Sequence, residues 1–126
     1  MTRMEHEELT HGIIGAPMDV HSTLGPGFLE SVYQEALEIE LQRRGIPFVA
    51  QQELHVTYKD TVLRHKYKPD LMVDGKVIVE IKAVSQLTDI DIAQTINYLK
   101  ATGYNVALLI NFAGKSLQWK RLVSSA

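Results

Sequence analysis

The chain has no cysteine among its 126 residues. This absence excludes a disulfide scaffold, a thiolate nucleophile, a zinc site built on cysteine and an iron–sulfur cluster. Long apolar runs are missing as well. The longest, Val106–Ile110, is far shorter than the roughly 20 residues that a membrane-spanning helix needs. The amino-terminal residues MTRMEHEELT lack the apolar core of a signal peptide, so we expect a cytoplasmic protein with no membrane partner.

No charge of one sign dominates, since the formal net charge is −2. Residues 1–40 carry eight acids and one base, whereas residues 41–126 carry twelve bases and seven acids. This balance argues against a general polyanion binder and leaves room for one basic face, with an ordinary mixed surface as the alternative. The composition, 45% hydrophobic and 22% charged, is typical of a globular protein. The length fits a single domain over residues 1–126.

The hydrophobic pattern changes from helical to alternating along the chain. Residues 5–24 and 28–44 have helical spacing, and Pro17 predicts that the first helix kinks or restarts. Alternating and apolar segments follow, which predict strands, and then comes a helix that Thr88 would cap. The expected later elements are strands at about 54–58, 61–73 and 76–83, a helix to about 102, a strand at 106–110 and an edge strand or tail at 117–122. This order predicts an α/β (α+β) fold, in which helices flank a mixed central sheet.

Two charged residues interrupt the most apolar strand. Glu80 and Lys82 are two residues apart, so both side chains leave the same face of the strand. Asp70 precedes Glu80 by ten residues, across an expected turn. Two carboxylates from neighbouring strands can hold a hard divalent cation through oxygen ligands, and a lysine beside them can orient a water. A Glu–Lys surface pair on a half-exposed strand is the alternative.

These residues resemble a known pattern. Pro69-Asp70, nine intervening residues and Glu80-Ile81-Lys82 are similar to the PD-(D/E)XK nuclease superfamily, whose restriction-endonuclease-like core has the order α-β-β-β-α-β. The segment from Gly27 to Tyr33, GFLESVY, resembles the GxxExxY family within it. The segments LGPGFLE, AQTINYLK and LINF agree with that family. The resemblance covers about residues 7–123. It implies one extra helix at the amino-terminal side of the core.

The resemblance implies a role for each residue of the motif. Asp70 and Glu80 would bind Mg²⁺ or Mn²⁺, assisted by the backbone carbonyl of Ile81. Lys82 would position the attacking water, and Glu30 would complete an acidic cluster directly or through a water. We expect the metal to activate the water and to stabilise the charge that develops on the phosphate.

Three further residues carry two interpretations each. Gln94 would face the same cleft and contact the site water or the substrate, or else form a local helix contact. Tyr33 shares a helix face with Glu30, and Tyr98 shares one with Gln94. Both tyrosines could support the site, although we favour core aromatics whose hydroxyls reach a partner.

A basic segment leads directly to Asp70. It contains Arg64, Lys66 and Lys68, which would hold phosphates beside the metal if they surround the cleft. An ordinary solvated strand face is the alternative.

These observations lead to two readings of function. The first is a metal-dependent nuclease that hydrolyses phosphodiester bonds, in DNA rather than RNA. The second is a non-catalytic nucleic-acid-binding or partner-binding module that retains the nuclease fold. The chain has no appended recognition domain, so specificity would come from a protein partner or from a homodimer.

The turn between the two carboxylates carries a conflict. Asp74-Gly75 signals a two-residue hairpin turn, which would pair Asp70 with Val79 and turn the aspartate away from Glu80. The site therefore requires a register shift of one residue. Two arrangements provide it: a three-residue loop over 73–75, which opposes Asp70 to Ile78, and a bulge at Pro69.

Overall fold

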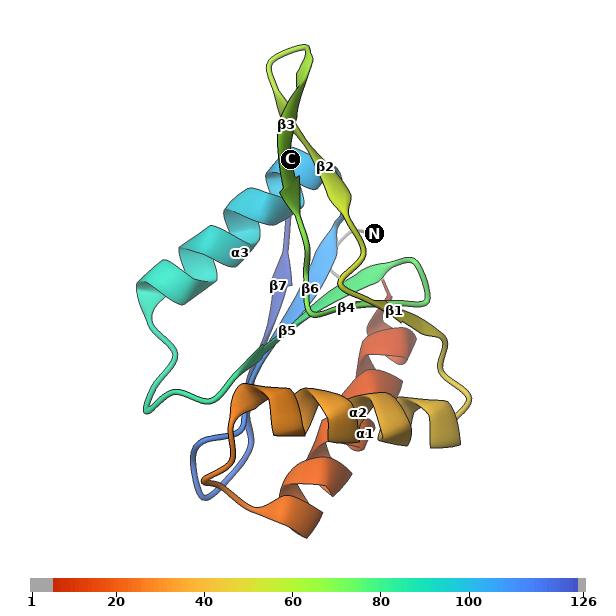
Figure 1. The fold of residues 1–126 in the computed structure, drawn as a ribbon, viewed down its shortest axis with the longest axis vertical. Coiled ribbons are helices and arrows are strands. Elements are labelled where there is room, and N and C mark those ends of the chain that lie inside the picture. The colour runs from red at the N-terminus through yellow and green to blue at the C-terminus, as the bar shows by residue number, and fades with distance from the viewer. Residues whose placement is uncertain (1–5, 125–126) are drawn as a thin grey trace.

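The computed structural model describes residues 6–124. This part of the chain forms three helices and seven strands (Figure 1). Their bounds, in order, are α1 (Glu7–Leu24), α2 (Glu30–Arg43), β1 (Phe48–Ala50), β2 (Leu54–Tyr58), β3 (Thr61–Tyr67), β4 (Leu71–Val73), β5 (Val77–Lys82), α3 (Asp89–Thr102), β6 (Val106–Asn111) and β7 (Gln118–Val123). Five strands form the main sheet in the order β1-β4-β5-β6-β7, and β2 and β3 form a separate pair.

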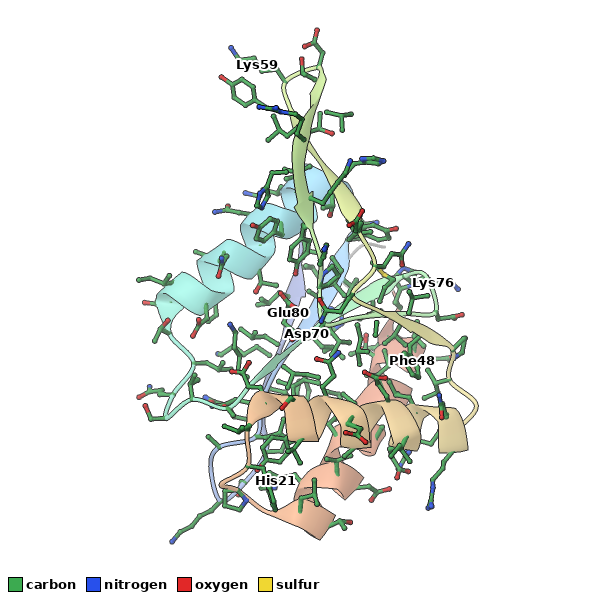
Figure 2. All side chains as sticks on the ribbon, viewed as in Figure 1. His21, Phe48, Lys59, Asp70, Lys76 and Glu80 are labelled. Atoms are coloured by element: carbon green, nitrogen blue, oxygen red, sulfur yellow. The ribbon has the colours of Figure 1, made fainter. Side chains whose placement is uncertain are left out.

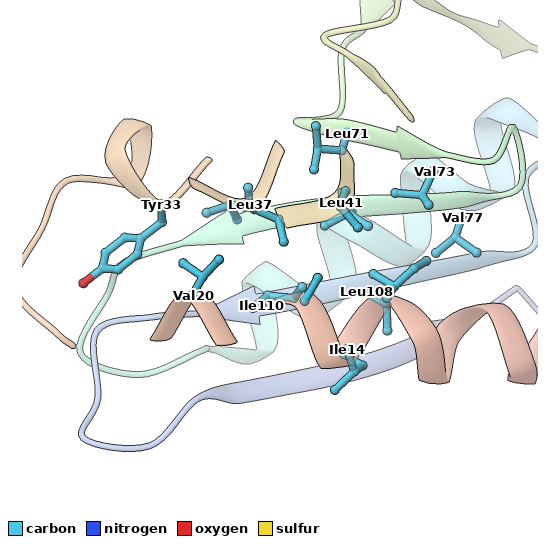
Figure 3. Packing of buried hydrophobic residues seen from close by; sticks show 14 of the residues in the cluster. Ile14, Val20, Tyr33, Leu37, Leu41, Leu71, Val73, Val77, Leu108 and Ile110 are labelled. Carbon is cyan, nitrogen blue, oxygen red and sulfur yellow. The ribbon is translucent and has the colours of Figure 1, made fainter. Parts of the chain in front are cut away.

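The main sheet is mixed, as the sequence predicts. β5 and β6 run parallel, with α3 in the crossover between them, and the other neighbouring strands are antiparallel. Val77 and Val79 of β5 pack into a core shared with α1 and α2 (Figure 3). Ile78, between them, packs into a second core shared with α3. Helices therefore cover both faces, and Glu80 and Lys82 lie on the face of Ile78 because strand side chains alternate.

Helix α1 runs through Pro17 without a break, so the restart allowed by the sequence does not occur. Its buried face includes Ile13, Ala16 and Val20, which belong to the first core. The helix therefore persists although Pro17 cannot donate a backbone hydrogen bond, because tertiary packing contributes most of the stability of a helix in a protein.

The single strand expected at 61–73 is wrong. β3 ends at Tyr67 and β4 begins at Leu71, and the two strands belong to different sheets. Pro69 lies in the gap, where its missing N–H prevents a continuous ladder. β2 and β3 consequently form a hairpin that projects from the main body, beyond the end of α3 (Figure 1). We call residues 54–67 the β-arm.

The β4–β5 register meets the requirement of the site. Leu71 pairs with Val79, so the next residue pair along the ladder is Asp70 and Glu80. The connection contains three residues, 74–76, and its first two have φ of 54° and 64°. The odd number of loop residues that the carboxylates require is confirmed.

The expected position of that loop, 73–75, is wrong by one residue. Val73 is fully buried and stays in β4, where its branched side chain is favoured. Asp74 and Gly75 instead take the two left-handed positions, which suit Asp and Gly far better than Val. The Asp74 N–H also donates to the Pro47 carbonyl at 2.8 Å. Asp70 therefore opposes Glu80 and not Ile78, without a bulge at Pro69.

Candidate active site

Asp70 and Glu80 are joined through the backbone of the hairpin. The Asp70 N–H donates to Glu80 Oε1 at 2.9 Å, and the Ile81 N–H donates to Asp70 Oδ2 at 2.7 Å. Both side chains are partly buried and lie where the β-arm, α2 and the main sheet approach one another (Figure 2). Backbone N–H groups of the hairpin thus help to fix the orientation of both carboxylates.

Burial raises the pKa of both carboxyl groups above the ordinary range. For Asp70, the Ile81 N–H opposes this shift and the charge of Glu30 adds to it. For Glu80, hydrogen bonds from Tyr67 and Asp70 oppose the shift, and the charge of Asp70 adds to it. The charge of Lys82 lowers both values. The pair therefore holds negative charge that its surroundings compensate only in part.

The sequence reasoning missed Tyr67, which contacts Glu80 directly. Its hydroxyl donates to Glu80 Oε2 at 2.7 Å, and its ring stacks on Tyr98 with centroids 3.9 Å apart. Burial and the charge of Glu80 raise the pKa of the Tyr67 hydroxyl, which keeps it a donor. Tyr98 thus reaches the site only through Tyr67. A tyrosine three residues before Asp70 was the available signal, but nothing in the strand pattern joins it to Glu80.

Replacing Tyr67 with phenylalanine removes the donor to Glu80 and keeps the stacked ring. We expect the free energy of unfolding to fall by about 2 kcal/mol, because the lost bond goes to a charged acceptor. Urea denaturation measures this change. Tyr58→Phe is the matched control in the same β-arm, since Tyr58 is 60% exposed. Equal stability of the two variants would contradict the role of the hydroxyl.

Lys82 follows Glu80 on the same face of β5 and is partly buried. Its strand neighbour across the parallel ladder is Asn111, which is 2% exposed. The Asn111 amide accepts from the Val84 N–H at 3.0 Å and donates to the Val84 carbonyl at 2.8 Å. Asn111, a second residue that the sequence reasoning missed, thus fixes the chain just beyond Lys82.

Glu30 is the first residue of α2, and it is exposed. Its carboxylate accepts from the Ala83 N–H at 3.3 Å, which brings it to the end of β5 beside the site. Tyr33 instead lies fully buried, with its ring stacked on Phe112 and its hydroxyl donating to the Gly25 carbonyl at 2.6 Å. The interpretation of Tyr33 as a core aromatic is confirmed, and its hydroxyl holds the loop that precedes α2.

Gln94 is exposed on α3 and lines a surface groove together with Ile90, Asn97 and Tyr98. The two carboxylates are not part of that lining. Gln94 therefore belongs to this groove on α3, and its contact with the site water or the substrate stays a prediction.

The basic segment lies on and below the β-arm. Arg64 is exposed, and Lys66 Nζ lies 2.8 Å from His55 Nδ1 across the two strands. Lys68 pairs with Glu53 at 3.5 Å. The interactions that the structure gives for Lys66 and Lys68 are with these neighbours and not with the carboxylates.

The donor set fits a hard divalent cation. Asp70, Glu80 and the Ile81 carbonyl offer oxygen atoms, the ligands that Mg²⁺ and Mn²⁺ prefer. Burial raises the pKa of both carboxyl groups, and a bound cation would favour their charged form. Within residues 6–124, no three acidic or histidine side chains are grouped closely enough to hold a metal. Asp70 and Glu80 therefore form a pair, and Glu30 lies beside it at the end of β5, where it accepts from the Ala83 N–H.

A mixed sheet between helices, with two carboxylates and a lysine at one hairpin, defines a nuclease-like α/β domain of the restriction-endonuclease type. Residues 7–122 match the family model of the PD-(D/E)XK nuclease superfamily. The chain belongs to this superfamily. No curated protein matches it, and no helix among residues 6–124 could cross a membrane.

Two solved structures share the fold. An alkaline exonuclease from Laribacter hongkongensis (LHK-Exo) matches 75% of this chain with a TM-score of 0.50. The protein SSO0001 matches 99% of this chain with a TM-score of 0.56. Both are 14% identical to this chain, which spans 56% and 62% of their respective lengths. The similarity therefore concerns the architecture.

Proposed function

We propose that the protein is a metal-dependent nuclease that hydrolyses phosphodiester bonds in DNA. The observation that supports this most directly is the position of Asp70 opposite Glu80, with Lys82 on the same face of β5. Membership of a nuclease superfamily is consistent with it. Mg²⁺ or Mn²⁺ would be held by Asp70, Glu80 and the Ile81 carbonyl.

The residues of the site have separate roles in the proposed reaction. Asp70 and Glu80 present oxygen ligands, and the Ile81 N–H and the Tyr67 hydroxyl hold these carboxylates in place. Lys82 orients the attacking water and stabilises negative charge on the phosphate. The bound metal ion would supply Lewis-acid stabilisation of that charge and a lower pKa for the water. Glu30 acts from the edge of the site, through a water.

The finer assignment is to the GxxExxY family. Its segment, from Gly27 to Tyr33, spans the end of the loop before α2 and the first turn of α2, where Glu30 and Tyr33 have separate contacts. We further propose that Gln94 contacts substrate from α3, that Arg64, Lys66 and Lys68 bind phosphates, and that a protein partner or a second copy supplies specificity.

Incubation of the purified protein with labelled single-stranded, double-stranded and branched DNA, and with RNA, tests this function. We expect cleavage of DNA with Mg²⁺ or Mn²⁺ and none with EDTA. The same series with Asp70→Ala protein controls for a contaminating nuclease. Cleavage that persists in this variant, or an absence of cleavage with every metal, would contradict the proposal.

A non-catalytic binding module is the second candidate, favoured by one observation. Both Glu80 oxygens already accept hydrogen bonds from protein groups, and no third acid joins the pair within residues 6–124. Calorimetric titration with Mn²⁺ separates the candidates. A nuclease binds the ion through Asp70 and loses binding in Asp70→Ala, whereas a module binds DNA equally well with and without the ion.

A further inference from the structure

The β-arm extends beyond the sheet that carries the candidate site. Its tip contains Lys59, and its base contains Tyr67, which donates to Glu80 (Figure 2). β3 alone has seven residues and therefore spans roughly 20 Å. A hairpin of this length that begins at the carboxylates would contact a substrate bound there over much of its own length.

The β-arm differs in charge from the rest of the molecule. Residues 54–67 hold three bases and one acid, so they sum to +2, while the remaining residues sum to −4. Lys59 and Arg64 are exposed, and Lys66 lies against His55 on the neighbouring strand. The β-arm is thus a cationic projection, and its charge attracts a polyanion.

The outer half of the β-arm also exposes apolar side chains. Tyr58, Val62 and Leu63 are 60%, 53% and 37% exposed. The pairing shifts register between His55 and Thr57, and such irregularities bend and twist a hairpin. Exposed apolar groups beside cations suit contact with a nucleic acid, which presents both phosphates and base edges.

We propose that the β-arm binds double-stranded DNA, with its two strands in the major groove and its cations on the flanking phosphates. The major groove of B-DNA is about 12 Å wide and admits a two-stranded β-ribbon. A single strand is usually bound by a groove lined with several aromatic platforms, whereas the outer β-arm exposes one aromatic ring, Tyr58. This inference rests on the proposed nuclease function and names its substrate as duplex DNA.

Reversal of two exposed charges tests the inference in the 126-residue chain. The variant is Lys59→Glu with Arg64→Glu, and the matched control is Arg43→Glu with Lys76→Glu, which makes the same change in net charge on α2 and the β4–β5 turn. Fluorescence anisotropy in EDTA measures binding to a 20-base-pair duplex and to one of its strands. Cleavage of bis(p-nitrophenyl) phosphate with Mn²⁺ measures chemistry on a substrate too small to reach the β-arm.

We expect the β-arm variant to lose about 10- to 100-fold in duplex affinity relative to the control, and the slope of log affinity against log salt to fall by about 2. Single-strand affinity should change less than duplex affinity, and the wild type should cleave the small diester. Equal duplex affinity in the two variants, or equal losses on duplex and single strand, would overturn the inference. Failure of the wild type to cleave either substrate would contradict the proposed function instead.

Discussion

Replacing Lys82 with alanine is expected to lower the rate of DNA cleavage by about 10²-fold or more, while the protein still folds and still binds Mn²⁺. The reason is the proposed division of roles, in which the lysine acts on the water and the phosphate and the two carboxylates bind the ion. Loss of a preorganised group that stabilises transition-state charge commonly costs about 10²–10³-fold in rate. Single-turnover cleavage of labelled DNA gives the rate, and calorimetry gives the Mn²⁺ affinity.

Lys76→Ala is the control for this prediction. Lys76 lies in the loop of the same hairpin, where it pairs with Asp74 at 3.7 Å and is exposed. Its removal should leave the cleavage rate within about twofold, because surface ion pairs contribute little to the fold. A Lys82→Ala protein as active as Lys76→Ala would show that Lys82 is a surface charge without a role in cleavage.

Replacing Asp70 with asparagine is expected to abolish Mn²⁺ binding and yet to stabilise the metal-free protein at pH 8. Burial raises the pKa of Asp70 and of Glu80 in the folded protein. Folded protein then binds more protons than unfolded protein between the ordinary carboxyl pKa and the raised values. The free energy of unfolding therefore falls as the pH rises through this window, and the variant lacks one of the charges responsible.

Thermal unfolding in EDTA from pH 4 to pH 8 measures this effect. The advantage of Asp70→Asn over the wild type should be greatest at pH 8 and should shrink as the pH falls, since the carboxylates of the wild type then become neutral. Glu35→Gln, which neutralises an exposed acid on α2, should follow the wild type at every pH. A variant less stable than the wild type at pH 8 would show that the charge of Asp70 stabilises the fold.

The face shared by Glu80 and Lys82 could be predicted because strand side chains alternate strictly. The cap of α3 could be predicted for a similar local reason, and Thr88 and Asp91 form a complete capping box. For the loop of the hairpin, the sequence could predict that the number of residues is odd but not which residues form it. Two carboxylates on one face of the hairpin require an odd number of loop residues, but the burial of Val73 and the contact of Asp74 with Pro47 decide which three they are.

The contact between Tyr67 and Glu80 could not be predicted, because it depends on how the β-arm docks. Tyr67 reaches the carboxylate because β3 lies outside the main sheet and the Tyr67 ring packs on Tyr98 of α3. The position of Glu30 is of the same kind. Its bond to the Ala83 N–H joins residues 53 apart in the chain, and no local pattern encodes a contact over that distance.

The short connection between Asp70 and Glu80 has a consequence for the order of folding. Their hairpin closes over ten residues, whereas the parallel pairing of β5 with β6 must wait for the crossover through α3. Contacts that are close in sequence form with the smaller entropic cost and so tend to form first. We therefore expect the two carboxylates to meet early in folding. A divalent cation in the refolding buffer would then reduce their repulsion and raise the folding rate.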